Sequence, residues 1–321
     1  MSETLLEVKN LKKYYSSSNG IFGKKNELVK AVDGVTFTID KGDVFGLVGE
    51  SGSGKSTIGK TILRLHDKTE GEVRYKGKDV FTLHKKDLRR LRVQTQLVFQ
   101  DPFSSLNPRI RVGDAIGEAM VQHGLATNKD VREKVLQVME TCGLSPYHVD
   151  RYPHEFSGGQ RQRIVIARAM ALKPEFLVMD EPVAALDVSI QAQIINLFSE
   201  LRKKSGLSYL FISHDLSVVE HLCTKIAIMY LGNIVELATK EELFDNPLHP
   251  YTKALLSAVP IPDPRIKRER IILKGDIPSP VNPPSGCKFR TRCPEATGLC
   301  AEMVPEFRDM GNGHFTACHY V

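Results

Sequence analysis

The chain has 321 residues, enough for about two domains of ordinary size, and 41% of them are apolar, which suffices for a buried core. The net charge of +6, from 44 basic and 38 acidic residues, is too weak to predict nucleic-acid binding without a clustered basic patch. No apolar run approaches the roughly 18 residues of a membrane-spanning helix, and the N-terminus lacks a signal sequence, so we expect the protein to stay in the cytoplasm.

The first 48 residues alternate apolar and polar positions, as half-buried strands do. Residues 6–9 and 35–39 show the pattern and predict an antiparallel sheet. A loop is predicted at residues 16–20 from composition. Tyr15 lies just before this loop, where it serves either as a core residue or as a ring on which adenine stacks.

A glycine-rich turn follows the apolar residues 44–48 and leads into a helix that continues to residue 65. Its residues are Gly49, Glu50, Ser51, Gly52, Ser53, Gly54, Lys55, Ser56 and Thr57. A turn of this kind directs backbone N–H groups and the positive end of the helix into one concavity, which fits the phosphates of a nucleotide. We expect Lys55 to contact the β- and γ-phosphates and the Ser56 hydroxyl to bind Mg²⁺.

Further strands are predicted at residues 72–75 and 95–99, and the second ends at Gln100. Gln100 is either a solvated loop residue or a contact to the metal and its water. Residues 101–156 then change to helical periodicity, which predicts a helical insertion.

The next helix begins with Ser157, Gly158, Gly159 and Gln160. Ser157 and Gln160 have the spacing of a capping box. A cap does not explain two glycines in the first turn, because glycine weakens a helix. Bare amides at a helix N-terminus predict a second phosphate-binding site.

An apolar strand at residues 176–179 ends at the carboxylates Asp180 and Glu181. Such a run is typical of a central parallel strand, and ligands bind at the carboxyl ends of these strands. We expect Asp180 to hold Mg²⁺ through water and Glu181 to act as general base on the attacking water. Another strand, residues 208–212, precedes His214, which either contacts the γ-phosphate or is a capping or buried residue.

The order of these motifs over residues 4–240 resembles the ATP-binding cassette (ABC) ATPases. The resemblance includes the sequence Ala-Ala-Leu-Asp at positions 184–187, which ends in Asp187. It implies an α/β P-loop NTPase fold with a parallel-sheet core, an antiparallel β subdomain and a helical subdomain. The domains implied are residues 1–239 and a small Pro- and Cys-rich extension, residues 240–321. ATP and Mg²⁺ are the expected ligands.

The same resemblance assigns roles to single residues. Tyr15 would stack on adenine, Glu181 would be the catalytic carboxylate and His214 the switch histidine, with Gln100 in the Q-loop. Two ATPase domains of this family meet head to tail, so Ser157, Gly158, Gly159 and Gln160 of one contact the ATP of the other. A single chain should therefore be nearly inactive. Ala184 stands where many members carry Ser.

A finer resemblance, to the ATPase subunits of bacterial oligopeptide and dipeptide importers, is carried by residues 99–109 and 246–256. The sequences of residues 107–109 and 256–260 more closely resemble those of the second of the two paired ATPases. This implies a heterodimer with a related ATPase, two membrane permease subunits, an extracellular peptide-binding protein and a place at the cytoplasmic face of the membrane. Nickel importers use similar ATPases. Soluble cassette ATPases that act on DNA or ribosomes are less consistent with a chain that has a single cassette. P-loop kinases are less consistent with the Ser157 motif.

The chain is Pro-rich from about residue 240, for example at residues 261–264, which predicts little regular structure. Four of the six cysteines lie there: Cys287, Cys293, Cys300 and Cys318. Their spacing is wider than the gaps of about two to four residues in zinc-binding pairs. Some relatives of this importer class carry a [4Fe–4S] cluster on a similar cysteine set. The alternatives are Zn²⁺ with His314 or His319, and free thiols. Cys142 and Cys223 are expected in the core.

Overall fold

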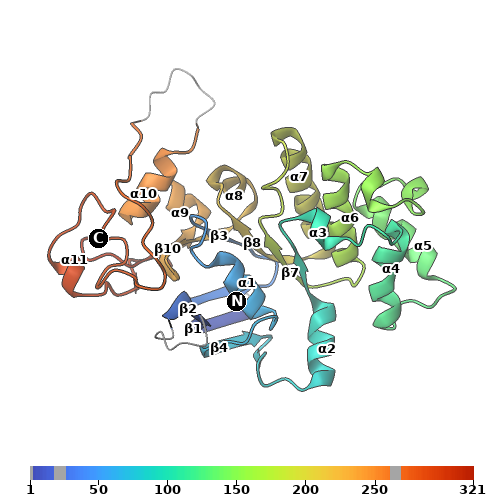
Figure 1. Ribbon diagram of the computed structural model, residues 1–321, viewed down its shortest axis with the longest axis horizontal. Coiled ribbons are helices and arrows are strands. Elements are labelled where there is room, and N and C mark those ends of the chain that lie inside the picture. The colour runs from blue at the N-terminus through green and yellow to red at the C-terminus, as the bar shows by residue number, and fades with distance from the viewer. Residues whose placement is uncertain (1–2, 18–26, 261–268) are drawn as a thin grey trace. The chain divides into compact units, whose positions relative to one another are not determined.

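The computed structural model describes residues 3–17, 27–260 and 269–321 of the chain. It divides into two units, which we call unit 1 (residues 1–81 and 213–321) and unit 2 (residues 82–212) (Figure 1). The loop predicted at residues 16–20 lies partly outside the described residues, and the Pro-rich residues 261–264 lie wholly outside them. None of the described helices is long and apolar enough to cross a membrane.

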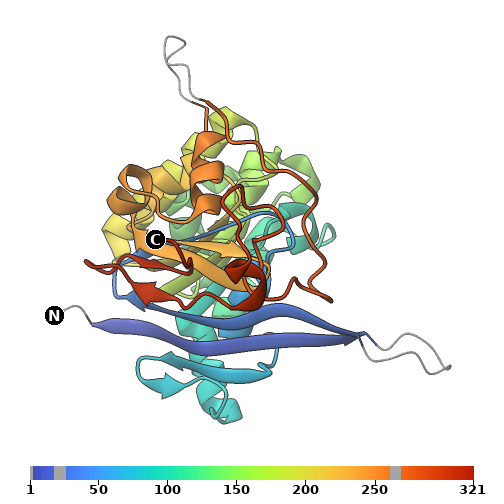
Figure 2. The ribbon, with the colours of Figure 1, turned by 90° about the vertical axis from the view of Figure 1, so that its left-hand side faces the viewer.

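Unit 1 contains an antiparallel sheet with the strand order β2-β1-β4-β5 (Figure 2). The strands are β1 (Thr4–Ser17), β2 (Glu27–Asp40), β4 (Glu70–Tyr75) and β5 (Lys78–Asp79). Val8 lies opposite Phe37, and both side chains are buried. The predicted antiparallel strands are therefore confirmed, and their alternating apolar residues form one side of the core.

A second set of strands in unit 1 brings the middle and the end of the chain together. Strand β3 (Val44–Val48) runs parallel to β9 (Lys225–Tyr230), and β10 (Asn233–Thr239) runs antiparallel to β9. The short C-terminal strands are β11 (Arg308–Asp309) and β12 (Phe315–Thr316), and β12 pairs with β10. Helix α1 (Lys55–Ile62) follows β3, and α8 (Leu216–Leu222) packs on β3.

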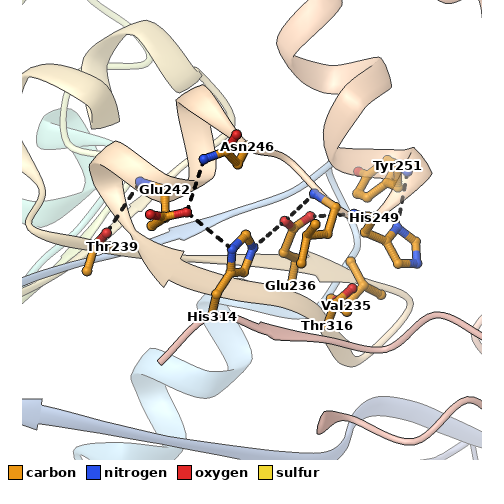
Figure 3. Close-up of polar contacts among 10 residues, drawn as sticks. Val235, Glu236, Thr239, Glu242, Asn246, His249, Tyr251, His314 and Thr316 are labelled. Atoms are coloured by element: carbon orange, nitrogen blue, oxygen red, sulfur yellow. Dashed lines mark hydrogen bonds and ion pairs between the residues drawn. The ribbon is translucent and has the colours of Figure 1, made fainter. Parts of the chain in front are cut away.

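A buried carboxylate fastens the C-terminal segment to β10. Glu236 is fully buried and accepts hydrogen bonds from the backbone N–H groups of Leu248, at 2.7 Å, and His249, at 2.9 Å (Figure 3). The Nε2 atom of His314 lies 2.8 Å from the same carboxylate. A buried charge needs several such partners to offset its desolvation. Glu236 thus fixes the loop before residue 250 and the hairpin that carries His314.

Helices α9 (Lys240–Asp245) and α10 (Pro250–Ser257) occupy a region for which the Pro-rich composition predicted little regular structure. Both have an N-cap: the Thr239 hydroxyl accepts from Glu242 N–H, and His249 Nδ1 accepts from Tyr251 N–H at 3.1 Å. These caps, together with Pro250 at the first helical position, are the signals that the composition obscured. Residues 269–321 do fit the expectation, since regular structure there is limited to α11 (Leu299–Glu302), β11 and β12.

In unit 2, the predicted central strand has a parallel strand on each side. Strand β7 (Phe176–Asp180) is buried throughout and lies between β6 (Thr95–Val98) and β8 (Ser208–Ser213), parallel to both. The helices are α2 (Lys85–Gln94), α3 (Pro102–Ser105), α4 (Val112–Gln122), α5 (Val131–Thr141), α6 (Gly158–Met170) and α7 (Val188–Ser205), with 3₁₀ turns η1 (Pro146–His148) and η2 (Pro153–Glu155). Helix α4 packs on α5 and α6, in agreement with the helical periodicity of residues 101–156 (Figure 1).

Candidate functional site

The glycine-rich turn joins β3 to α1 in unit 1. Gly54 has φ of 105°, and a Cβ there would lie 2.0 Å from the backbone oxygen of Ala31. At Gly49 a Cβ would lie 2.2 Å from the backbone oxygen of Met229. Both positions therefore require glycine, because the loop packs directly against other backbone. The first turn of α1 carries no acidic residue, so its positive end remains suited to an anion.

Lys55 is folded back over this loop. Its side chain is buried, and Nζ donates hydrogen bonds to the carbonyl oxygens of Gly49, at 2.7 Å, and Glu50, at 3.0 Å. This ammonium group is buried at the start of a helix and bound to two loop carbonyls, so it is placed to contact phosphate oxygens. Ser56 and Thr57 follow in the first turn of α1. The loop is thus arranged as the sequence predicted, and the ligand roles of its residues stay predictions.

The predicted catalytic residues of unit 2 lie at the end of β7. Asp180 ends the strand and is buried, and Glu181 follows it with φ of 48°. A residue other than glycine in this left-handed region costs on the order of 1–3 kcal/mol, and such strain gathers at functional sites. The backbone N–H of Glu181 donates to Ile212 O at 3.0 Å, which helps to hold it there.

Gln100 is brought to the same place by β6, the neighbour of β7. Its Nε2 donates to Glu181 Oε2 at 3.0 Å. Gln100 is exposed and lies just after β6, as a solvated loop residue would, and its amide also holds one oxygen of the carboxylate that the sequence assigns as general base.

The Ser157 motif begins α6 in unit 2. The predicted capping box is confirmed: Ser157 N–H donates to Gln160 Oε1 at 3.0 Å, and Gln160 N–H donates to the Ser157 hydroxyl. The two glycines differ. A Cβ at Gly159 would lie 2.5 Å from Ile190 Cγ2 on α7, so Gly159 is required by helix packing. At Gly158 the nearest atom would be Leu186 Cδ2 at 3.7 Å, so packing gives no reason for that glycine.

The structure also shows the local surroundings of Tyr15, His214 and Asp187. Tyr15 is half-buried on β1 with its ring edge-on to His66, rather than in the core. His214 is exposed, and the cap of α8 is Asp215 instead. Asp187 caps α7 by accepting from Ile190 N–H at 3.0 Å. The Ser189 hydroxyl, which also donates to Asp187, holds the pKa of that carboxyl below its usual range.

All four C-terminal cysteines line one cavity of about 20 Å³ in unit 1, together with His319. None forms a disulfide. Burial raises the pKa of Cys287, and that of Cys293 to about 11, so both are thiols at neutral pH unless a metal binds them. The cavity holds no more than about one or two waters. Among residues 3–17, 27–260 and 269–321, no group of three or more His, Cys, Asp and Glu side chains is placed to bind a metal ion. Cys142 and Cys223 are buried, as predicted.

Comparison with known proteins identifies the family of the chain. The ABC transporter family matches residues 32–184, and the family described as the C-terminal region of oligopeptide/dipeptide transporters matches residues 235–300. The oligopeptide transport ATP-binding protein AppF of Bacillus subtilis is 54% identical over 99% of this chain and 97% of its own. The dipeptide transport ATP-binding protein DppF of Haemophilus influenzae is 48% identical over 99% of this chain and 97% of its own.

Solved structures show the same fold. The protein cbiO1 of Clostridium perfringens, part of an ABC transporter complex, has a TM-score of 0.65 at 26% identity and covers 76% of this chain and 92% of its own. A dimeric ATP-binding cassette in a post-hydrolysis state, bound to ADP and Pi, also has a TM-score of 0.65 at 26% identity, over 74% of this chain and 99% of its own.

Fold and matches together define an ATPase of the ABC type, and the predicted fold class is confirmed. The chain belongs to the ABC transporter family, among the ATP-binding proteins of oligopeptide and dipeptide transporters.

Proposed function

We propose that this ATPase powers the import of oligopeptides or dipeptides through membrane permease subunits. The observation that carries the proposal is the match of residues 235–300 to the C-terminal region of oligopeptide/dipeptide transporters, because this region lies outside residues 32–184, which match the general ABC transporter family. Relatives named for oligopeptide and dipeptide transport match almost the whole chain, which supports the same substrate class.

In this proposal the ATP phosphates bind in the loop from Gly49 to Thr57, with Lys55 on the β- and γ-phosphates. Ser56 and Asp180 would hold Mg²⁺, and Gln100 would contact the metal when the nucleotide is bound. Mg²⁺ would supply positive charge to the phosphate oxygens. A hydroxyl and a buried carboxylate are oxygen ligands that suit this ion.

Glu181 is the proposed general base, and its pairing with Gln100 supports that role. The Gln100 amide fixes the direction of the carboxylate, and the left-handed backbone at Glu181 is a strained conformation of the kind found at functional sites. His214 would contact the γ-phosphate, and Tyr15 would stack on adenine. Tyr15 is half-buried and His214 exposed, so both are accessible to a ligand.

The proposed assembly is a head-to-tail dimer with a related ATPase, in which the Ser157 motif and Asp187 face the partner's nucleotide. The open surroundings of Gly158 support this, as does the dimeric state of the solved cassette with ADP and Pi. Two permease subunits, an extracellular peptide-binding protein and a position at the cytoplasmic face of the membrane complete the proposal. No nucleic-acid partner is expected.

The test is reconstitution of the chain with its related ATPase, its permeases and its binding protein in lipid vesicles. We expect ATP-dependent uptake of labelled di- and oligopeptides, and we expect a complex that carries Glu181→Gln to take up none. Uptake of nickel in place of peptides, or ATPase activity stimulated by DNA or ribosomes rather than by permeases, would contradict the peptide assignment.

We also propose that Cys287, Cys293, Cys300 and Cys318 bind a [4Fe–4S] cluster, with Zn²⁺ as the alternative. Their convergence on one cavity supports the proposal. The present cavity is too small for a cluster, so the thiol groups would have to separate on binding. Protein purified without oxygen should contain about four iron and four sulfide per chain. Zinc alone, or neither metal, would reject the cluster.

A further inference from the structure

The C-terminal extension touches the phosphate loop directly, at Glu50. Arg292 donates two hydrogen bonds to the Glu50 carboxylate, from Nη1 to Oε2 at 2.6 Å and from Nη2 to Oε1 at 3.0 Å. The Arg292 side chain is 8% exposed and that of Glu50 is 27% exposed. Two parallel hydrogen bonds between a guanidinium and a carboxylate fix both direction and distance.

The backbone of Glu50 is held by the same extension. Its N–H donates to the Tyr251 hydroxyl at 3.2 Å. The Tyr251 ring is fully buried and packs on Tyr230 and Phe289, with ring centroids 4.9 and 5.2 Å away. Tyr251 belongs to α10, whose preceding loop is fastened by Glu236 (Figure 3). A chain of buried contacts therefore leads from β10 through α10 to the phosphate loop.

Glu50 also contacts the lysine that the phosphate site needs. The Glu50 carbonyl accepts from Lys55 Nζ at 3.0 Å. One residue thus joins Lys55 to two residues of the extension, through its carbonyl, its N–H and its carboxylate. Movement of Glu50 would disturb the loop amides and the lysine together.

The charge of Glu50 makes these contacts important for a phosphate ligand. A loop that binds anions through N–H groups and a helix N-terminus is weakened by a carboxylate of its own, because like charges repel. Arg292 offsets that charge by pairing with the carboxylate. We propose that Arg292 and Tyr251 are positioning residues for ATP: the extension neutralises Glu50 and holds the phosphate loop in its binding conformation. This inference rests on the proposed nucleotide site.

The test compares ATP affinity in single and double variants of the full-length protein. Arg292→Ala should raise the Kd and the KM for Mg·ATP by about tenfold or more and change kcat much less, because an unpaired carboxylate is left in the loop. In Arg292→Ala/Glu50→Gln the repelling charge is gone, so affinity should recover most of the loss. Salt should reduce the penalty of the single variant. Tyr251→Phe keeps the ring packing and should also raise the KM.

Arg290→Ala is the matched control. Arg290 lies in the same segment but donates to Ser285 rather than to the loop, so its removal should leave the Kd for ATP unchanged. Normal ATP affinity in Arg292→Ala would overturn the inference. So would a loss that Glu50→Gln does not rescue, since that pattern indicates general damage to the extension. Lys55→Ala separates the two proposals: if it binds ATP normally, the nucleotide site itself is wrong.

Discussion

Glu181 combines a strained backbone with a hydrogen bond from a neighbouring strand. Its φ of 48° is held by the bond from its N–H to Ile212, and Gln100 fixes its carboxylate. Glutamine at this position keeps the size and the hydrogen-bonding capacity of the side chain and removes only its basicity. A defect in Glu181→Gln therefore reports the proton-accepting role rather than the fold.

The prediction for Glu181→Gln is that ATP binding is retained while hydrolysis falls by about 10² to 10⁴, the range that general-base catalysis contributes. The ATP-bound dimer should accumulate, because the step that reopens it is blocked. Equilibrium binding and steady-state phosphate release measure the two effects. Hydrolysis at the wild-type rate would show that another group is the base.

At the level of single elements, α10 depends on a histidine that must remain neutral. His249 is buried, and this burial, helped by the charge of Lys253, lowers its pKa from 6.5 to about 3. Its Nδ1 accepts the Tyr251 N–H at the start of the helix. Between pH 3 and 6.5 the unfolded chain binds a proton at this residue and the folded chain does not.

Stability from His249 is therefore complete above pH 6.5 and is lost as the pH falls toward 3, by up to about 1.4 kcal/mol per pH unit. His249→Asn keeps an oxygen for the cap and does not titrate, so its unfolding free energy should fall less steeply between pH 7.5 and 5.5. Exposed His221, changed to Asn, is the control and should keep the wild-type slope. Equal slopes for wild type and His249→Asn would refute the prediction.

The elements that the sequence predicted well are those set by local pattern. An unbroken apolar run predicts strand β7. The glycines predict the loop before α1, and close backbone contacts at Gly49 and Gly54 require glycine there. Gly159 shows the limit of such reasoning. Its glycine predicts a phosphate site, and the structure adds a second reason for glycine there, the close approach of Ile190 on α7. A helix-packing partner 31 positions away (190 − 159) leaves no mark in the local sequence.

The contacts of Glu50 could not be predicted either, because its partners are also far away in the sequence. Arg292 is 242 positions from its partner, and neither residue belongs to a local motif that names the other. The Pro-rich composition predicts little regular structure where α9 and α10 form, although Thr239 and Pro250 are local signals for the starts of these helices. Contacts between residues far apart in the sequence, and the caps of α9 and α10, could therefore be identified only from the structure.

For the whole molecule, the proposed dimer requires each ATP to contact two chains, so two variants should separate the halves of one site. Lys55→Ala removes the ammonium from this chain's own phosphate loop and should abolish its nucleotide binding. Gly158→Asp should retain that binding and lose ATP-dependent assembly with the related ATPase, because a carboxylate would face the partner's phosphates. The open space at Gly158, and the preference of helix N-termini for acidic residues, should keep α6 folded.

Sedimentation of the mixed ATPases with and without ATP measures assembly, and nucleotide binding by each chain is measured separately. Gly158→Ala is the control for size: it adds a methyl group without charge and should assemble better than Gly158→Asp. If Gly158→Asp assembles as the wild type does, the Ser157 motif does not face a nucleotide. The capping box would then be its whole role, since Ser157 and Gln160 already satisfy each other within α6. A charge effect confined to assembly would instead support the proposal that half of each ATP site belongs to the neighbouring chain.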